Sequence, residues 1–275
     1  MTDIVRPALF QKVPFAIFAA VSIAVLALGL DHITQAEMFD LYVLHAAGRA
    51  VLAGINPYTL PDKLNFYTPA WSLVLLAPLS LVPFRIVAIG WVLATYITWI
   101  AVLRAYRTDW LGCALFLVNP FFIYGLALGS YDWLALLGLF LPMQAGVWFL
   151  LLKPQLSVGL LAWHTQRVGI WQAVRDYWLA GIVFAGSLLL GFYRADVLDV
   201  PWNLSLGWFG VPIGLLMVWQ SFTRGDSMYA LAAAPFLSPY VAIQTWALPL
   251  LLLTRDRRIL AVGVIVSWVY IIATK

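Results

Sequence analysis

Long apolar stretches recur along the whole chain, and they constrain its fold more than any other feature. A helix that crosses a bilayer needs about 20 mostly apolar residues. Of the 275 residues, 64 % are hydrophobic and only 10 % are charged, and a soluble protein of this length could not bury so much apolar surface. The composition therefore excludes a soluble enzyme and a nucleic-acid-binding protein, and it predicts an all-α polytopic membrane protein.

We predict about 9–11 transmembrane helices in a single domain that covers residues 1–275. The apolar segments lie at 13–30, 70–84, 86–104, 110–128, 131–142, 143–163, 177–193, 202–221, 228–238, 239–254 and 259–273. Several of them are short and contain proline. Because broken helices at membrane depth are tolerated only against protein or water, we expect the bundle to enclose a cavity.

The distribution of Lys and Arg predicts the orientation. The formal net charge is +4, and cytoplasmic loops of membrane proteins carry the excess of Lys and Arg. The best alternation puts the N-terminus in the cytoplasm of a multi-pass cell-membrane protein and the 31–69 segment outside. It places Arg85, Arg167, Arg224, Arg255, Arg257 and Arg258 inside, and Arg49, Arg104, Arg107 and Asp109 outside. Arg104 and Arg107 do not fit this alternation, so the alternative is that one short segment does not cross.

The 31–69 segment contains a predicted amphipathic helix that lies on the membrane surface. Apolar residues recur at helical spacing from Phe39 to Ala53, and Gly54 has the position of a C-terminal glycine. His45 and Arg49 share one face of this helix. They are either an interfacial histidine and a snorkelling arginine or two residues that bind phosphate. Asp40, at the start of this helix, is either its N-cap or a general base at the membrane surface.

Lys153 lies inside a predicted span, directly before Pro154. A charge at mid-span costs about 2.5–3.5 kcal/mol on insertion scales, so such a residue is a functional candidate. We therefore expect Lys153 to face the bundle interior. In the alternative interpretation Asp132 is its structural counter-ion, and the two residues form a neutralised pair. The three histidines are scattered and no paired-carboxylate motif occurs, so we expect no metal site.

Seven short motifs in order along the chain resemble one family. They are Asp40-Leu41-Tyr42-Val43, Gly54-Ile55-Asn56-Pro57-Tyr58, Phe66-Tyr67-Thr68-Pro69, Ala77-Pro78-Leu79, Gly129-Ser130-Tyr131-Asp132, Lys153-Pro154-Gln155 and Ser238-Pro239. Together they are similar to the polyprenol-phosphate-dependent glycosyltransferases of the GT-C superfamily, in particular the family 87 mannosyltransferase-like proteins. Gln244 or Thr245 stands where that family carries a histidine.

The resemblance implies a GT-C-like bundle and transfer of a mannose-like hexose or a pentose from a polyprenyl-phosphate donor, on the outer face, to a lipid, glycan or protein acceptor. It implies that Asp40 is the catalytic base. The residues available to bind the donor phosphate and the substrates are Lys153, Arg49, His45, Tyr67, Gln155, Arg194 and Gln244. The expected partners are membrane lipids, the lipid-linked sugar and proteins of a membrane complex, with no nucleic acid and no cofactor beyond the donor.

Two other functions stay open from the sequence. One is a non-catalytic relative of the same fold that binds lipid or stabilises a complex. The other is a transporter of a lipid or small molecule, in which Lys153 and the broken helices would serve the pathway. An outer cavity with Asp40 at its rim favours the enzyme, a filled interior favours the non-catalytic subunit, and access from both sides favours the transporter.

Overall fold

The computed structural model describes residues 9–31, 33, 38–60, 68–69, 71–189, 200 and 202–274, and these parts are helical with no strand. The α-helices are α1 (Leu9–Asp31), α2 (Phe39–Leu52), α3 (Ser72–Leu76), α4 (Phe84–Ala105), α5 (Trp110–Leu117), α6 (Pro120–Leu128), α7 (Asp132–Leu137), α8 (Met143–Leu150), α9 (Pro154–Val168), α10 (Ile170–Leu189), α11 (Gly210–Arg224), α12 (Ser227–Ala232), α13 (Ala234–Leu237), α14 (Ala247–Leu253) and α15 (Arg257–Thr274). Short 3₁₀ helices lie between them: η1 (Pro57–Thr59), η3 (Ala77–Leu81), η4 (Gly138–Phe140), η6 (Gly207–Phe209) and η7 (Ile243–Trp246).

Only a few helices are long and apolar enough to cross a bilayer alone. Among the described residues these are α1 from Val13, α4 and α15, and the pair α5–α6, bent by 63°, would make a fourth. A helical membrane protein is therefore supported, whereas the expected 9–11 spans and the GT-C-like arrangement are not established. Most of the other described helices are too short to cross singly, and α10, with 20 residues, is long enough but is not among the helices that are apolar enough.

Prolines explain most of these interruptions, because proline lacks the backbone N–H that a helix interior needs. Pro120, Pro154 and Pro235 stand in the first turns of α6, α9 and α13, where that N–H has no helical partner. Pro83 and Pro142 directly precede α4 and α8. Prolines were expected to break or kink the apolar segments, and at Pro120, Pro142, Pro154 and Pro235 a new helix begins.

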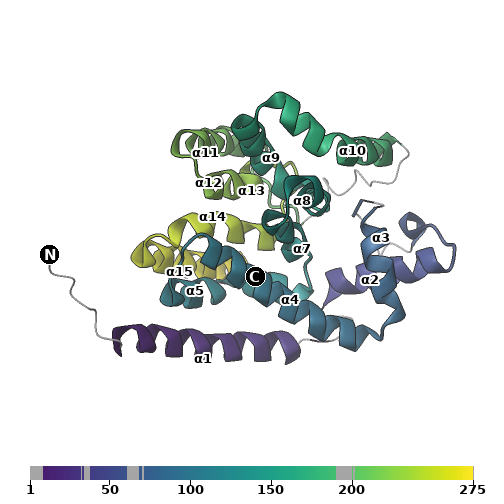
Figure 1. Ribbon diagram of the computed structural model, residues 1–275. Coiled ribbons are helices and arrows are strands. Elements are labelled where there is room, and N and C mark those ends of the chain that lie inside the picture. The colour runs from purple at the N-terminus through teal and green to yellow at the C-terminus, as the bar shows by residue number, and fades with distance from the viewer. Residues whose placement is uncertain are drawn as a thin grey trace.

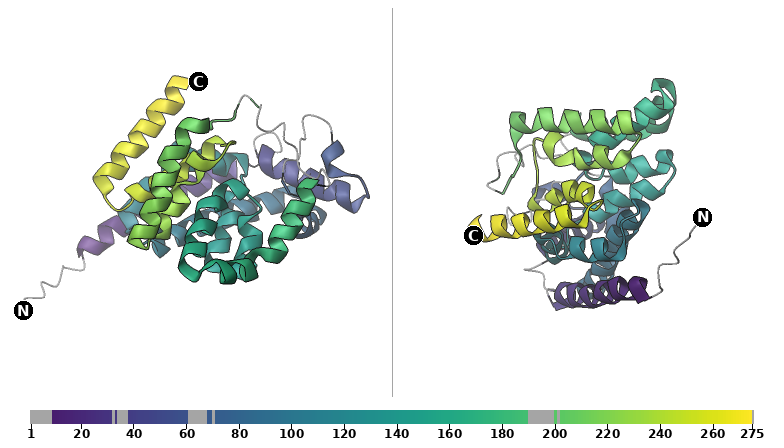
Figure 2. Two further views of the ribbon diagram at one scale, coloured as in Figure 1. Left: turned by 90° about the horizontal axis from the view of Figure 1, so that it is seen from above. Right: turned by 90° about the vertical axis from the view of Figure 1, so that its left-hand side faces the viewer.

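The helices form a layered bundle. Figure 1 shows α1 along one edge and α9 to α11 along the opposite edge, with α5, α14 and α15 between them, and the second view of Figure 2 has the same order. Aromatic contact joins α1 to α5, where the ring centroids of Phe18 and Trp110 lie 4.7 Å apart. A 2.5 Å hydrogen bond from Tyr96 Oη to Ser22 Oγ joins α4 to α1.

The helix predicted in the 31–69 segment is confirmed as α2, which ends before Gly54 with its φ of 73°. Its setting differs from a helix that only rests on a membrane surface. Seven of its fourteen residues are buried, and it packs against η3, α3 and α6. The helix is therefore part of the bundle and can place side chains in its interior.

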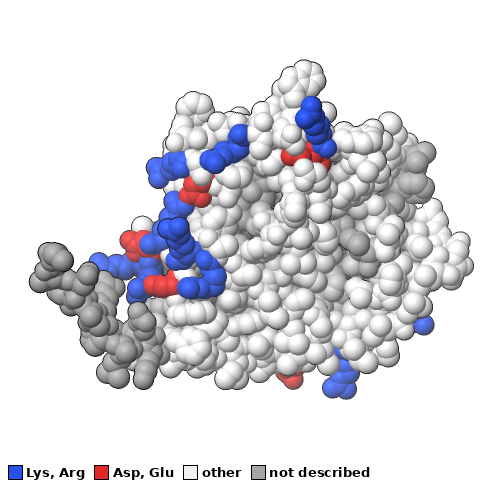
Figure 3. All heavy atoms as spheres, viewed as in Figure 1, with Lys and Arg blue, Asp and Glu red and all other residues white. Residues whose placement is uncertain are grey.

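Most of the described arginines gather at one end of the bundle, which we call the arginine end. Arg255 pairs with Asp226 and Arg257 pairs with Asp109, and Arg167 lies against Gly225. Figure 3 shows Lys and Arg collected along one side of the face in view, while most of that face is neither basic nor acidic.

This arrangement corrects part of the predicted alternation. Arg104, Arg107 and Asp109 lie at the arginine end, with Arg255 to Arg258, and not at the α2 end. Arg85 is at the α2 end, since the neighbouring Phe84 ring contacts Tyr42 and His45 of α2. The reason is that α3 and η3 are too short to cross and pack on α2 instead, so α4 starts from the end at which α2 lies.

Candidate functional site

Asp40 is the second residue of α2 and carries no capping bond. The helix begins at Phe39, its N-cap residue is Met38, and no side chain caps it. The N-cap interpretation of Asp40 is therefore wrong. Within the described parts of the chain the half-buried carboxylate has no hydrogen-bond or ion-pair partner. No residue that the structure describes therefore occupies its oxygens.

The surroundings of Asp40 make its carboxyl a stronger base than usual. The residue lies outside the candidate spans. Burial raises the pKa of the Asp40 carboxyl to about 6, and the positive charge of Lys153 opposes part of that rise. Desolvation disfavours the charged form of a carboxyl. A pKa near the working pH is what a general base needs.

Lys153 faces the bundle interior, as predicted. It is the residue directly before α9 and is 3 % exposed. Its ammonium group forms an ion pair with the Asp132 carboxylate and lies 5.0 Å from the centre of the Tyr131 ring. The suspected pairing with Asp132 is confirmed. A buried charge is tolerated when it is paired and hydrogen-bonded.

A hydrogen-bonded chain extends this pair into the bundle. Ser130 Oγ donates to Asp132 Oδ1 at 3.0 Å, and Gln244 Nε2 donates to Ser130 Oγ at 3.2 Å. Trp91 Nε1 on α4 donates to the Ser130 carbonyl at 3.1 Å. We call Lys153, Asp132, Ser130 and Gln244 the buried network; each member is at most 6 % exposed.

Gly129 allows α2 to approach this network. It follows α6 with a φ of 69°, a left-handed conformation that favours glycine. A Cβ at this position would come within 2.7 Å of the Leu41 Cβ on α2. Because Ser130 directly follows Gly129 and Asp40 directly precedes Leu41, this close contact brings the base candidate and the network to the same region.

The network leaves little space on its inner side. Between α4, α6 and Gln244 lies a cavity of only about 10 Å³, lined by Thr95, Trp99, Ser130 and Asp132 among others. A water molecule needs roughly this much, so no substrate-sized ligand fits there. Two buried polar atoms next to network residues in the sequence, Trp133 Nε1 and Thr245 Oγ1, have no hydrogen-bond partner among the described residues.

His45 and Arg49 belong to a different surface. They line a groove of about 410 Å³ between α2 and residues 80–84, and His45 Nε2 lies 3.1 Å from the Val82 carbonyl oxygen. Arg49 follows Asp40 by nine residues, which is half a turn away on a helix. The structure therefore places His45 and Arg49 together in a groove, with Arg49 on the opposite side of α2 from Asp40, and their role in binding the donor phosphate stays a prediction.

Other predicted site residues have different outcomes. Gln155 is half-buried in the first turn of α9, two residues after Lys153. Gln244, predicted from its place after Ser238-Pro239, joins the buried network. Tyr67 and Arg194 lie outside the described residues, and so does Lys63.

Ser130 was expected only as part of a motif, and Trp91 had no predicted role. The Gly-Ser-Tyr-Asp motif contained the signal for Ser130, because a hydroxyl two residues before a carboxylate can hydrogen-bond it locally. Nothing local to Trp91 indicated its contact, which spans 39 residues. In the described parts of the chain no group of three His, Cys, Asp or Glu could hold a metal ion.

A second buried polar cluster was not predicted. The Asp176 carboxylate on α10 accepts hydrogen bonds from Gln144 of α8 and from Gln172, and lies 2.9 Å from His164 Nε2 of α9. All of its acceptor oxygens are engaged within the protein. This cluster joins three helices and leaves no carboxylate oxygen without a partner, unlike Asp40.

Comparison of the chain with protein families, with curated proteins and with solved structures finds no match in any of the three.

Proposed function

We propose that this protein is a membrane glycosyltransferase that transfers a sugar from a polyprenyl-phosphate donor to an acceptor hydroxyl, with Asp40 as the general base. One observation carries the proposal: Asp40 is a half-buried carboxylate without a partner among the described residues, and Lys153 lies close enough to influence its pKa. A carboxylate that served only structure would be expected to have its oxygens paired, as those of Asp176 are.

The chemistry needs few groups. The oxygen of the acceptor hydroxyl bonds to the anomeric carbon of the sugar, and Asp40 accepts the proton that this hydroxyl loses. The bond from that carbon to the phosphate oxygen breaks, and its electron pair leaves with the polyprenyl phosphate. Since this leaving group is already anionic, it needs no general acid, only donors that hold its charge.

Lys153 is suited to hold the leaving phosphate. Its ammonium group has three N–H donors, and Asp132 accepts from one of them. Gln155, two residues later in the chain, has an amide group. The pairing with Asp132 keeps Lys153 fixed for this task. We propose only the class of each substrate. The sugar is a mannose-like hexose or a pentose, and the acceptor is a hydroxyl group of a lipid, a glycan or a protein.

The site is proposed to face outward. Arg104, Arg107, Arg224 and Arg255 to Arg258 lie at the arginine end, whereas Arg49 and Arg85 lie at the α2 end. Cytoplasmic ends carry the excess of Lys and Arg. This contrast supports a cytoplasmic arginine end and an outer α2 end, and thus a cytoplasmic start of α1.

Transfer by isolated membranes tests the function. Membranes containing the protein are incubated with radiolabelled polyprenyl-phosphate mannose and an extracted lipid acceptor fraction, and Asp40→Asn is compared with the wild type. Loss of a general base is expected to lower transfer by about 10²-fold or more. The matched control is Asp31→Asn, an exposed carboxylate at the end of α1, which should transfer like wild type. Transfer by Asp40→Asn within a few-fold of wild type would remove Asp40 as the base.

The pH dependence of transfer is a second test. Only the ionised Asp40 can accept the proton, and its pKa is raised to about 6. Transfer should therefore fall as the pH drops through about 6, whereas an ordinary aspartate would lose its charge near 4. A profile that stays flat down to pH 5 would contradict this assignment.

Cysteine labelling tests the orientation. The native Cys113 is buried and should not react. Asn56→Cys, in the exposed segment after α2, should react with a membrane-impermeant maleimide in intact cells, and the opposite control Arg258→Cys only after permeabilisation. The reverse pattern would invert the proposed orientation.

A non-catalytic, lipid-binding subunit is the second candidate, and the small inner cavity beside the buried network favours it. In that case the Lys153–Asp132 pair only joins α7 to α9. The assay separates the two functions. Wild-type membranes that show no transfer with either hexose or pentose donors, while the protein co-purifies with a membrane partner, would favour the subunit.

A further inference from the structure

A hollow with a charged lining lies at the arginine end, remote from Asp40. It has a volume of about 670 Å³ and is lined by residues 106–109 and 254–258. We call it the arginine hollow. Neither the proposed transfer reaction nor the buried network uses any of these residues.

Three candidate spans meet at the arginine hollow. The helix α4 ends at Ala105, the bent pair begins with Trp110, and α15 begins with Arg257. Because helices that cross a bilayer end at the level of the lipid headgroups, the hollow lies at that level. The guanidinium of Arg104 lies 4.4 Å from the centre of the Trp110 ring, a combination of side chains suited to the membrane interface.

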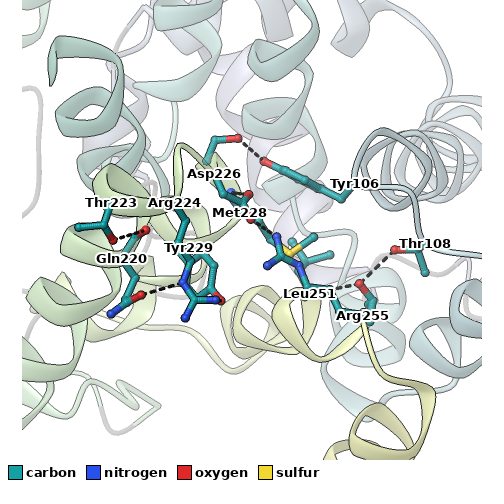
Figure 4. Close-up of polar contacts among 12 residues, drawn as sticks. Tyr106, Thr108, Gln220, Thr223, Arg224, Asp226, Met228, Tyr229, Leu251 and Arg255 are labelled. Carbon is teal, nitrogen blue, oxygen red and sulfur yellow. Dashed lines mark hydrogen bonds and ion pairs between the residues drawn. The ribbon is translucent and has the colours of Figure 1, made fainter. Parts of the chain in front are cut away.

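The base of the hollow is held by buried hydrogen bonds. Thr108 Oγ1 donates to Thr254 Oγ1 at 3.0 Å, and Arg104 donates to the Thr108 carbonyl at 2.6 Å. Tyr106 Oη and Ser227 Oγ lie 3.1 Å apart, and Figure 4 shows Tyr106 and Thr108 with their polar contacts. These contacts fix two loops that are nearly 150 residues apart in the sequence, so the hollow is a preformed feature.

The lining has an excess of positive charge. Four arginines face two aspartates. Arg257 pairs with Asp109 at 2.6 Å, and Arg255 pairs with Asp226 outside the lining. Asp256 accepts the backbone N–H of Arg258 at 2.8 Å and so caps α15.

Arg107 and Arg258 are the unpaired cations of this lining. Both are exposed, and neither side chain has an ion-pair or hydrogen-bond partner among residues that the structure describes. Arg107 also has a φ of 61°, an uncommon conformation for a residue other than glycine. An arginine kept there without an internal partner is suited to an anionic ligand from outside.

We propose that the arginine hollow binds the phosphate headgroup of an anionic phospholipid in the adjacent leaflet. Arginine binds phosphate with two parallel hydrogen bonds, and basic pockets between helix ends bind anionic headgroups. The acyl chains have a path along α15, where Ile259, Val262 and Val266 are each more than half exposed. A free phosphate compound shares the headgroup chemistry but makes no use of this apolar face.

Lipid titration in detergent tests the proposal. The purified protein in a neutral detergent is titrated with short-chain phosphatidylglycerol, and bound lipid is counted by native mass spectrometry. Each arginine near an anionic headgroup is worth about fivefold in affinity. The variant Arg107→Gly with Arg258→Gln should therefore bind phosphatidylglycerol more than about tenfold more weakly than wild type. Glycine suits the backbone at position 107.

The matched control is Arg224→Gln, which removes one positive charge from the same end. Arg224 does not line the hollow; it donates to Gln220 at 2.8 Å and to Tyr229 Oη at 2.9 Å, as Figure 4 shows. This variant should bind phosphatidylglycerol within about twofold of wild type. The single variant Arg258→Gln, at an exposed position, keeps the test decisive if the double variant unfolds, and should bind about fivefold more weakly.

Two further titrations identify the ligand. Phosphatidylcholine, which has no net charge, should bind at least tenfold more weakly than phosphatidylglycerol, and millimolar inorganic phosphate should not displace the lipid. Equal binding of both lipids, or unchanged binding by the arginine variants, would overturn the proposal. Displacement by inorganic phosphate would overturn the lipid assignment and identify a free phosphate compound as the ligand.

Discussion

The α2 end and the arginine end of the bundle handle charge in opposite ways. At the α2 end Lys153 and Asp132 are buried, 3 % and 5 % exposed, and pair with each other. At the arginine end Arg257 and Asp109 also pair, but about half of each side chain is exposed. One bundle thus contains both a buried and an exposed ion pair.

This difference in burial separates the charges on which folding depends from the charges that are available to ligands. A buried pair is costly to break, because the remaining charge stays in a medium of low polarity. An exposed pair is weakened by water and salt and contributes little. Substitutions at the two ends should therefore differ in effect by several-fold, and each prediction below tests a part of this difference.

The largest effect is expected from Lys153→Met. This change leaves the Asp132 carboxylate buried without its counter-ion and should lower the free energy of unfolding by about 3–5 kcal/mol. Thermal unfolding in detergent, followed by circular dichroism, measures the loss.

Asp132→Asn supplies the control for this prediction. Adding it to Lys153→Met removes both charges and keeps an acceptor for Ser130 Oγ, which now donates to Asp132. The double variant should regain most of the lost stability. If it is no more stable than Lys153→Met alone, the cost does not come from an unpaired carboxylate.

The second effect concerns Asp40, which burial disfavours in its charged form. Because the folded protein holds the Asp40 proton more tightly than the unfolded chain, stability falls as the pH rises from about 4 to about 6. Asp40→Asn avoids this cost and should raise the free energy of unfolding by about 1–2 kcal/mol at pH 7.5, after allowance for partial exposure. At pH 4.5 the gain should shrink to about a third.

This gain has a functional meaning. A residue whose removal stabilises the protein but abolishes transfer is kept for activity and not for folding. Asp40→Asn should therefore express as well as wild type. A variant that is less stable than wild type at pH 7.5 would show that the carboxylate contributes to folding.

Local features of the sequence predicted local features of the fold. The apolar spacing and Gly54 predicted α2, which ends as expected. The cost of a mid-membrane charge predicted that Lys153 faces inward, and its pairing with Asp132 was already among the alternatives. Each of these inferences depends on a few neighbouring residues or on one large energy, so a single chain carries enough information for them.

Long-range placement could not be predicted in the same way. Whether residues 71–81 cross the membrane decides the side of every later loop, and hydropathy alone does not separate a short crossing helix from one that packs on α2. The contact between Gln244 and Ser130 joins residues 114 apart, and no local pattern indicates it. Asp40 and Arg49 lie in one short helix, but nine residues separate them, so they are half a turn apart around its axis.

The smallest effect is expected at the arginine end, from Arg257→Gln. The ion pair of Arg257 with Asp109 is short, at 2.6 Å, but both side chains are about half exposed, so the pair should contribute less than about 1 kcal/mol. Raising the salt from 50 mM to 500 mM should reduce even this contribution, whereas the buried Lys153–Asp132 pair should respond little.

Asp109 also accepts the Gly112 N–H at 2.7 Å and so caps α5. Asp109→Asn keeps that cap, because asparagine caps about as well as aspartate, and should therefore cost no more than Arg257→Gln. A loss near 3 kcal/mol for either variant, insensitive to salt, would show that the arginine end depends on its charges for folding as the α2 end does, and the contrast between the two ends would be lost.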